Sequence, residues 1–295
     1  MSLGTPDPAL SVVVPVGRVD HALEVQLDAL AGQQSRHPFE VVLACNVPDP
    51  AVLRRVVALA AARDPAWRAV AASGRRGPSH ARNAGASAAV AERLAFCDGD
   101  DIVQPGWVEA MAQALDTWDA VGGHLEPFGL PEAELAARPP PTPAGLPTFM
   151  GVPYALSANV GVRRGAFDAV GGFDESLETC EDIALSWRLQ AAGFSLGWAP
   201  AAVIAYRHRA GLRAMLSQHA RYGRGMSQLL MRYGVPAGDG WRPAGRLLVT
   251  GNAQQGARAS WRSRARRGAI AAGRLMGLVE EAIRTRRGPP RSAAG

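Results

Sequence analysis

Short apolar runs alternate with amphipathic stretches through the first 125 residues. The first run, at residues 10–16, is β-branched and predicts a buried strand, and further strands are predicted at residues 39–45, 67–72, 93–97 and 120–125. The stretches between them predict helices at residues 20–33, 51–63, 79–91 and 105–117. This alternation predicts an α/β fold with a Rossmann-like, mostly parallel sheet and helices on both of its faces.

The pattern changes after residue 125. Eight prolines between residues 127 and 153 predict a long irregular loop, which in a compact domain is more often functional than idle. We expect this loop to close over bound substrates as a flap. The elements expected after it are a segment near 159–162, a helix at 181–192, a strand pair at 194–206 and helices at 212–232 and 258–287.

The composition is that of a soluble globular protein. Hydrophobic residues make up 47% of the 295-residue chain, enough for a sizeable core, and no apolar run is long enough to span a bilayer. Three widely spaced cysteines argue against a disulfide scaffold and against a zinc site. The apolar run near the N-terminus is short and contains Pro15, which argues against a secretory signal. We therefore expect a cytoplasmic protein.

Charge divides the chain into two parts. All 32 basic residues are arginines. Residues 1–239 hold 20 arginines against 24 acidic residues, whereas residues 240–295 hold 12 arginines against two. We expect a mildly acidic domain over residues 1–239 and a basic helical C-terminal extension over residues 240–295.

The helix expected in this extension has an apolar face. Its members recur at offsets of three and four: Trp261, Ala265, Ala272, Leu275, Met276, Val279 and Ile283. Two interpretations stay open. The face packs on the chain's own domain, or it lies on an anionic membrane surface, peripheral to the inner face of the cell membrane. Specific nucleic-acid binding is not expected, because Trp241 and Trp261 are the only aromatic residues of the extension available for stacking.

The strongest chemical signal follows the strand at 93–97. Asp98, Asp100 and Asp101 place three carboxylates within four residues, and such charges repel one another unless a cation is present. Ligands of open parallel sheets bind beyond the carboxyl ends of the strands. The cluster therefore suits a hard cation, Mg²⁺ or Mn²⁺, which also binds phosphate oxygens. A simple turn before the helix near Pro105 is the alternative.

Four further motifs accompany the cluster. ARNAG lies at 81–85, GGFDE at 171–175, Glu181-Asp182 after it and QHARY at 218–222. In this order they resemble the inverting family-2 glycosyltransferases over roughly three quarters of the chain. The resemblance implies a GT-A fold with its catalytic domain in residues 1–239. It also implies a hexosyltransferase-like transfer from a nucleotide-sugar donor to a sugar, lipid-linked or small-molecule acceptor, in polysaccharide or glycoconjugate biosynthesis.

The resemblance further implies roles for the acidic residues. Asp100 corresponds to the family's direct metal ligand, and Asp98 to a residue that contacts ribose or a metal-bound water. Asp182 corresponds to the general base and Glu181 to its structural neighbour. A single base opposite the leaving group implies inversion at the sugar. Without the other motifs, Glu181 and Asp182 would be interpreted as a charged first helical turn.

Two later motifs add candidate ligands. Gln218, Arg221 and Tyr222 share one helix face and resemble the QxxRW element of processive polysaccharide synthases. There the arginine holds the diphosphate and the aromatic residue faces the acceptor sugar. Tyrosine in place of tryptophan leaves processivity open. His208 corresponds to a histidine that completes the metal site in some relatives, and an ordinary surface position is the alternative.

The end of the second strand departs from the family pattern. Many relatives have an aspartate there that reads the base of UDP, whereas this chain has Cys45 and Asn46. Because a thiol is a weak acceptor, either Asn46 or the backbone reads the base, or the donor is not a UDP-sugar. Pro15 and Val16 correspond to backbone contacts with the donor. Arg82 either reaches the diphosphate or pairs with the acidic cluster.

Two other functions compete with glycosyl transfer. A nucleotidyltransferase of similar fold would need a glycine-rich basic loop after the first strand, and residues 15–18 contain one glycine. A catalytically degenerate binding module would be consistent with Cys45. The joint presence of Asp100, Asp182 and Arg221 argues against such a module.

Overall fold

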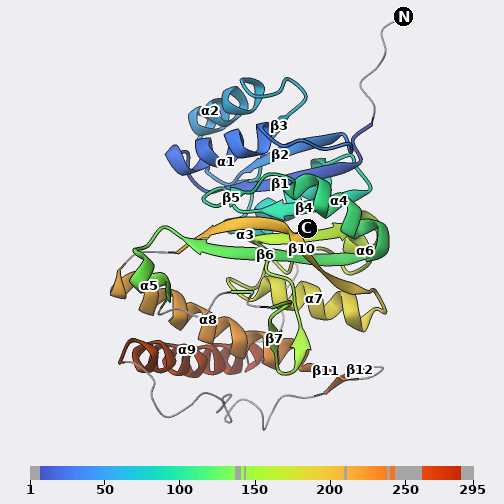
Figure 1. The fold of residues 1–295 in the computed structure, drawn as a ribbon. Helices are drawn as coiled ribbons and strands as arrows, with labels where there is room; N and C mark the ends of the chain where they lie inside the picture. The colour runs from blue at the N-terminus through green and yellow to red at the C-terminus, as the bar shows by residue number, and fades with distance from the viewer. Residues whose placement is uncertain are drawn as a thin grey trace, which may run out of the picture. The chain divides into compact units, whose positions relative to one another are not determined.

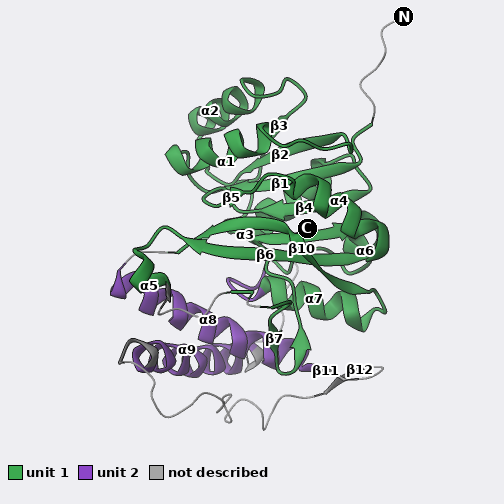
Figure 2. Ribbon diagram, viewed as in Figure 1, with its two compact units in different colours: residues 1–175, 181–208 green, residues 176–180, 209–295 purple. Residues whose placement is uncertain are grey.

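The computed structural model describes residues 7–136, 141–142, 144–208, 211–237, 240–242 and 261–286. The chain divides into two compact units (Figure 2). Unit 1 comprises Met1–Glu175 and Glu181–His208, and unit 2 comprises Ser176–Cys180 and Arg209–Gly295. The domain boundary expected between residues 239 and 240 stays a prediction, since residues 238–239 lie outside the described residues.

Unit 1 is built on one mixed sheet with the strand order β3-β2-β1-β4-β9-β6-β10-β5 (Figure 1). Its strands are β1 (Leu10–Val16), β2 (Phe39–Cys45), β3 (Arg68–Ala71), β4 (Arg93–Cys97), β5 (Ile102–Val103), β6 (Ala120–Phe128), β9 (Asn159–Arg163) and β10 (Leu196–Arg207). The parallel pairs are β1 with β2, β1 with β4, β2 with β3 and β6 with β10. β9 runs antiparallel to its two neighbours, β4 and β6, and β5 runs antiparallel to β10.

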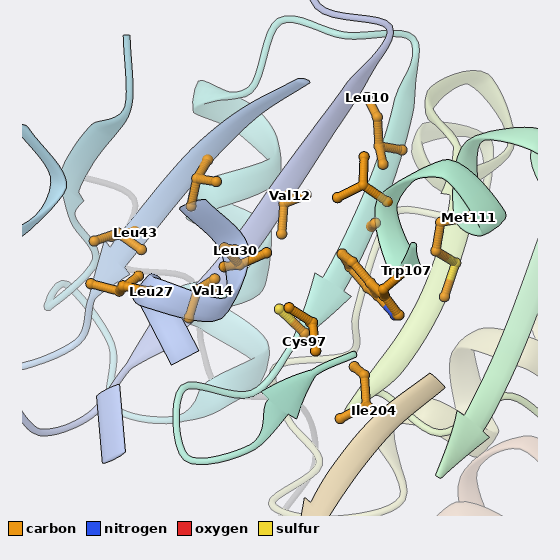
Figure 3. Close-up of a cluster of buried hydrophobic side chains, with 14 of the residues drawn as sticks. Leu10, Val12, Val14, Leu27, Leu30, Leu43, Cys97, Trp107, Met111 and Ile204 are labelled. Carbon is orange, nitrogen blue, oxygen red and sulfur yellow. The ribbon is translucent and has the colours of Figure 1, made fainter. Parts of the chain in front are cut away.

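Helices cover both faces of this sheet, as the alternating pattern predicts. They are α1 (His21–Ala31), α2 (Pro50–Ala61), α3 (Pro78–Ala88), α4 (Trp107–Thr117), α6 (Arg164–Ala169) and α7 (Glu181–Ala191), and a short helix, α5 (Glu132–Ala136), follows β6. Successive strand residues point to opposite faces, so Val12 and Val14 pack with α1 and α4 (Figure 3), whereas Val13 packs with α3, α6 and α7. The predicted α/β fold is therefore confirmed.

The strand order places the ends of three strands at one edge. β1 lies between β2 and β4, so the order of the strands reverses at β1, the position where open α/β sheets bind ligands. Val16 pairs with Cys45 in register, and Val13 pairs with Phe96, two residues before Asp98. The predicted donor and metal residues at these ends therefore come from neighbouring strands.

Two expectations after residue 125 need correction. The strand pair expected at 194–206 is one strand, β10, whose pairing with β6 shifts register between Ala199 and Val203. Pro200 lies at this shift, and because proline has no N–H it interrupts the hydrogen-bond ladder between β10 and β6. In the sequence, a proline at this position looks like a turn between two strands. The proline-rich stretch is not wholly irregular, because it contains α5 and the two-stranded pair of β7 (Thr148–Phe149) and β8 (Val152–Pro153).

The proline-rich stretch is also anchored near its middle. Leu125 N in β6 donates a 2.8 Å hydrogen bond to Thr142 Oγ1, and the Thr142 side chain is buried. Residues 137–140 and 143 lie outside the described residues, and the role of this stretch as a flap stays a prediction.

Unit 2 contains two long helices, α8 (Leu212–Tyr233) and α9 (Trp261–Arg286), and a hairpin of β11 (Val235–Ala237) and β12 (Gly240–Arg242). Glycines let α8 and α9 pack backbone against backbone. A Cβ at Gly273 would overlap the Ala220 carbonyl oxygen, and one at Gly277 would lie 2.5 Å from the Arg224 carbonyl oxygen. The helix expected near the C-terminus is therefore present, and its predicted residues 258–260 and 287 lie outside the described residues.

The interpretation that the apolar face of this helix packs on the chain is wrong for its C-terminal half. Gly273 and Gly277 face α8, whereas the four large apolar residues that the sequence assigns to the face in that half are exposed: Leu275, Met276, Val279 and Ile283. The glycine face packs on α8 in place of the apolar face, because the two helix backbones approach more closely there than a leucine or methionine side chain would allow. In the described part of the chain, we find no helix with the length and apolar character needed to cross a membrane.

Candidate active site

The acidic loop after β4 is held by a buried glutamine. Gln26 of α1 is completely buried and donates a 3.1 Å hydrogen bond to the Asp98 carbonyl oxygen. Its own Oε1 accepts a 2.9 Å hydrogen bond from Val103 N. One side chain therefore fixes both ends of the turn that carries Asp98, Asp100 and Asp101.

Arg82 of α3 connects the acidic loop to the Glu181-Asp182 pair. Its guanidinium is 3% exposed and donates hydrogen bonds of 2.6 Å to Asp98 Oδ1 and 3.0 Å to Glu181 Oε1. Burial alone would lower the pKa of Arg82, but Asp98 and Glu181 raise it, so the pKa lies above its ordinary value and the group stays charged. Two motifs separated by about eighty residues in the sequence thus share one buried cation.

Glu181 and Asp182 form the first turn of α7. Ser157 supports both of them, since its Oγ donates to Glu181 Oε1 at 3.2 Å and its N to Asp182 Oδ2 at 3.4 Å. The preceding residue, Cys180, has a φ of +66°, a conformation that is strained for a cysteine and sets the start of this helix. Burial and the neighbouring Glu181 raise the pKa of Asp182 to about 7. Such a carboxylate can accept a proton at neutral pH.

The other two aspartates of the loop differ in exposure. Asp101 is 1% exposed, and burial followed by the charge of Asp98 raises its pKa to about 9. Arg207 N of β10 donates a 2.7 Å hydrogen bond to Asp101 Oδ1, whereas Asp101 Oδ2 is buried with no hydrogen-bond partner in the described part of the chain. The Asp100 side chain is 44% exposed, and its Oδ2 lies 3.6 Å from Arg18 Nη2. Asp100 is thus the aspartate of the loop most open to a ligand.

His208 follows Arg207 at the end of β10. Arg207 Nε donates a 2.8 Å hydrogen bond to the Asp100 carbonyl oxygen, so the end of β10 adjoins the acidic loop. The ring of His208 packs edge-on against Tyr206, with 5.4 Å between ring centroids. Among the described residues, no three His, Cys, Asp or Glu side chains are grouped to hold a metal ion. The ligand roles of Asp98, Asp100 and His208 stay predictions.

At the end of β2, Cys45 is buried in the core, and Asn46 organises a neighbouring loop. Asn46 Nδ2 donates to the carbonyl oxygens of Ala72 and Arg75, and its Oδ1 accepts a 2.9 Å hydrogen bond from Gly77 N. The side-chain amide is therefore engaged with protein groups. Of the two base-reading contacts expected, this favours the backbone over Asn46, and the donor-binding roles of Cys45 and Asn46 stay predictions.

At the end of β1, the backbone adjoins both neighbouring strands. Val16 O accepts a 2.8 Å hydrogen bond from Asn46 N. Pro15 O lies next to the acidic loop, since a Cβ at Gly99 would be 3.5 Å from it. The donor contacts expected of Pro15 and Val16 stay predictions.

The QHARY residues belong to unit 2, in α8. Gln218 Nε2 donates a 2.7 Å hydrogen bond to Tyr222 Oη, which links the first and last members of the motif. Thr179 Oγ1 donates a 2.9 Å hydrogen bond to Arg221 O. Arg221 Nε is buried and has no hydrogen-bond partner among the described residues, so it can accommodate an anionic ligand.

Three contacts of the site were not expected from the sequence: those of Gln26, Ser157 and Arg207. Gln26 had a recognisable signal, because it is a polar residue on a helix face that also carries Leu23, Leu27 and Leu30. Ser157 and Arg207 had none. They reach the acidic residues only because β9 and β10 bring distant parts of the chain together.

Sequence comparison gives the family. The profile of Glycosyl transferase family 2 matches residues 11–171, more than half of the chain. The chain belongs to glycosyltransferase family 2. A second profile, Glycosyl transferase family group 2, matches residues 149–275 of this glycosyltransferase.

Curated relatives include two proteins of similar identity. The pre-mycofactocin glycosyltransferase of Mycobacterium tuberculosis (strain ATCC 25618 / H37Rv) is 34% identical over 172 residues, covering 54% of this chain and 36% of that protein. The succinoglycan biosynthesis protein ExoO of Rhizobium meliloti (strain 1021) is 34% identical over 173 residues, covering 52% of this chain and 48% of that protein. The matched segment thus spans about a third to a half of the length of these relatives.

Solved structures share the fold at low sequence identity. The mannosyltransferase PcManGT from Pyrobaculum calidifontis, in complex with GDP-Man and Mn²⁺, has a TM-score of 0.59 at 18% identity, covering 96% of this chain and 80% of that one. GalNAc-T7 with UDP, GalNAc and Mn²⁺ has a TM-score of 0.60 at 13% identity, covering 97% and 58%. The predicted GT-A fold of this family-2 glycosyltransferase is therefore confirmed.

Proposed function

We propose that this glycosyltransferase moves a sugar, with inversion and with the help of a divalent metal ion, from a nucleotide-diphosphate donor to an acceptor hydroxyl. Asp182 acts as the general base. The observation that carries the proposal is the position of Arg82, which holds Asp98 and Glu181 on one buried guanidinium. The acidic loop and the candidate base are thus parts of one site.

The residues at the acidic loop fit a divalent cation. Asp98 and Asp100 supply carboxylate oxygens, the ligands that Mg²⁺ and Mn²⁺ prefer. Two observations support this fit: Asp101 Oδ2 is buried with no hydrogen-bond partner among the described residues, and burial together with the charges of Asp98 and Asp100 raises the pKa of Asp101. A bound ion would neutralise charge on the departing diphosphate. His208 is the candidate for a further ligand.

The remaining residues transfer a proton, orient the base and bind the diphosphate. Asp182, with its pKa near 7, takes the proton from the acceptor hydroxyl, and Glu181 and Ser157 hold the base in place. Arg221, whose Nε has no hydrogen-bond partner among the described residues, is the candidate of unit 2 for binding the diphosphate, a role that rests on motif order. In this scheme Asp182 activates the acceptor hydroxyl, which attacks the anomeric carbon directly as the diphosphate leaves, and a single displacement of this kind inverts the anomeric centre.

The nucleotide of the donor is a nucleoside diphosphate, read at the ends of β1 and β2. Solved structures of similar fold contain GDP-Man in one case and UDP-GlcNAc in another, so this fold can bind a guanine or a uracil nucleotide. The backbone of Pro15 and Val16 lies at this edge and is our candidate for reading the base, because the Asn46 side-chain amide is engaged with the loop at 72–77.

A donor panel tests the proposal. The purified chain is incubated with GDP-, UDP- and dTDP-sugars and Mn²⁺, and release of the nucleoside diphosphate is measured with and without a chelator. We expect release from one nucleotide class, its loss with the chelator and its return when Mn²⁺ is restored. Binding of a nucleotide without turnover of any donor would instead support a binding module.

A further inference from the structure

The helix α9 has one face occupied by α8. The glycines Gly273 and Gly277 lie against the backbone of α8, and the two acidic residues of α9 also point to this side. Glu280 Oε2 forms an ion pair with Arg224 Nε at 2.6 Å, and Glu281 Oε1 forms one with Arg232 Nη2 at 2.5 Å. Both carboxylates of α9 are therefore neutralised by arginines of α8.

The outer face of α9 is apolar and exposed. Leu275 is 65% exposed and Val279 is 52% exposed, and Met276 and Ile283 belong to the same set. Residues 275, 279 and 283 follow one another at intervals of four, so they form one continuous row along the helix. Four large apolar side chains gathered on one helix face mark a contact surface more often than single exposed ones do.

The N-terminal end of this row is basic. Arg264 and Arg267 are exposed, and Arg264 lies three helical turns before Leu275 on the same side of the helix. Arg284 lies seven residues after Gly277, on the side of α9 that faces α8, and pairs there with Glu281. No acidic residue of α9 lies on this outer side in the described residues, since Glu280 and Glu281 are engaged with α8. The outer face thus combines an apolar row with positive charge.

We propose that this outer face of α9 binds the surface of an anionic phospholipid bilayer. Apolar side chains would enter the boundary between headgroups and acyl chains, while the arginines contact lipid phosphates. Charge decides between a bilayer and a second copy of the chain. Two copies joined through this face would offer Arg264 and Arg267 no acidic partner from the outer face of α9, whereas an anionic lipid surface satisfies both the apolar and the charged groups.

Vesicle co-sedimentation of the full chain tests the proposal. Binding is measured with phosphatidylglycerol-containing vesicles and with pure phosphatidylcholine vesicles, at low and at high ionic strength. We expect binding to the anionic vesicles at low ionic strength. In high salt or on the neutral vesicles, we expect the binding to be weaker by about tenfold or more.

Matched charge variants locate the surface. Leu275→Asp/Val279→Asp removes the apolar row, and Val57→Asp/Val90→Asp makes the same change at valines of unit 1 that are 46% and 58% exposed. We expect the first pair to weaken vesicle binding by about tenfold or more and the second pair to leave most of it. Circular dichroism and urea unfolding show whether each variant is folded.

A further variant covers the case in which the first pair does not fold. Arg264→Gln/Arg267→Gln changes two exposed side chains, and we expect it to reduce the salt dependence of binding while the fold is kept. Equal binding to neutral and anionic vesicles, or equal losses in the two aspartate pairs, would overturn the proposal. So would a concentration-dependent dimer, lost in Leu275→Asp/Val279→Asp, in a protein that ignores vesicles.

Discussion

Arg82 donates a 2.6 Å hydrogen bond to Asp98 from a guanidinium that is only 3% exposed. This pair is costly to break from the side of Asp98, because Arg82 would then be a buried charge with less compensation, whereas the Asp98 side chain is 30% exposed. Glu181 completes the arrangement at 3.0 Å on the other terminal nitrogen. The stability of unit 1 and the geometry of its site therefore depend on the same side chain.

Replacing this arginine should reveal that dependence. Arg82→Met removes the charge at similar length, and we expect the free energy of unfolding to fall by about 3–5 kcal/mol. The control Arg93→Met breaks a pair with Asp116 whose carboxylate is half exposed, and should cost about 1 kcal/mol or less. Urea unfolding measures both. Similar losses in the two variants would show that Arg82 makes no special contribution.

The pKa of Asp182 predicts the pH profile of the reaction. A base must be deprotonated, so the turnover rate should rise with pH and reach half of its plateau near pH 7. Asp182→Asn should lower turnover by about 10²–10⁴-fold and abolish this rise, while nucleotide affinity stays close to that of the parent. Asp168→Asn, at an exposed position in α6, serves as the control and should behave like the parent.

The same pKa predicts an effect on stability with a definite sign. A carboxyl group whose pKa rises from an ordinary 3.8 to about 7 on folding binds its proton more tightly in the folded state. Its contribution is therefore fully present below about pH 4 and is lost as the pH rises through 7. Asp182→Asn should unfold like the parent at pH 4 and exceed it by about 1–3 kcal/mol at pH 8. A variant less stable than the parent at pH 8 would contradict this.

Gln26 should affect ligand binding through the loop that it holds. Gln26→Met keeps the length of the side chain but leaves the Asp98 carbonyl oxygen and Val103 N without their partner. We expect nucleoside diphosphate binding with Mn²⁺ to weaken by about 10–100-fold, as for other groups that orient metal ligands. Gln113→Met, at a surface position of α4, is the control, and calorimetry with and without Mn²⁺ provides the measurement. Equal affinities in the two variants would remove Gln26 from the site.

The first half of the fold was predictable because its periodicity is local. The bounds of β1, β2 and β4 agree with the apolar runs that predicted them, since a buried strand shows itself as a short continuous apolar segment. β10 was not predictable as one strand, because Pro200 interrupts its ladder without ending it. The antiparallel insertion of β9 between β4 and β6 depends on tertiary pairing, which no local pattern records.

For the site, the sequence supplied the residue types but not their connections. Motif order indicated that Asp98, Glu181 and Asp182 belong to one centre, and it left two partners open for Arg82. The structure pairs Arg82 with Asp98 and Glu181. The exposure of the apolar row on α9 was likewise not decided by periodicity, because an amphipathic pattern looks the same whether its apolar face is covered or open.

The glycines of α9 provide the last prediction. A Cβ at Gly273 would overlap the Ala220 carbonyl oxygen, and a backbone atom cannot avoid it by changing rotamer. Gly273→Ala should therefore force α8 and α9 apart and lower the free energy of unfolding by about 1–3 kcal/mol. Gly268→Ala is a matched control on the same helix, where a Cβ would meet nothing within 4 Å. There the gain in helix propensity should stabilise the protein by about 0.5–1 kcal/mol. Urea unfolding followed by circular dichroism distinguishes the two signs. If both alanines stabilise the protein, propensity governs α9 and its close contact with α8 is not formed in solution.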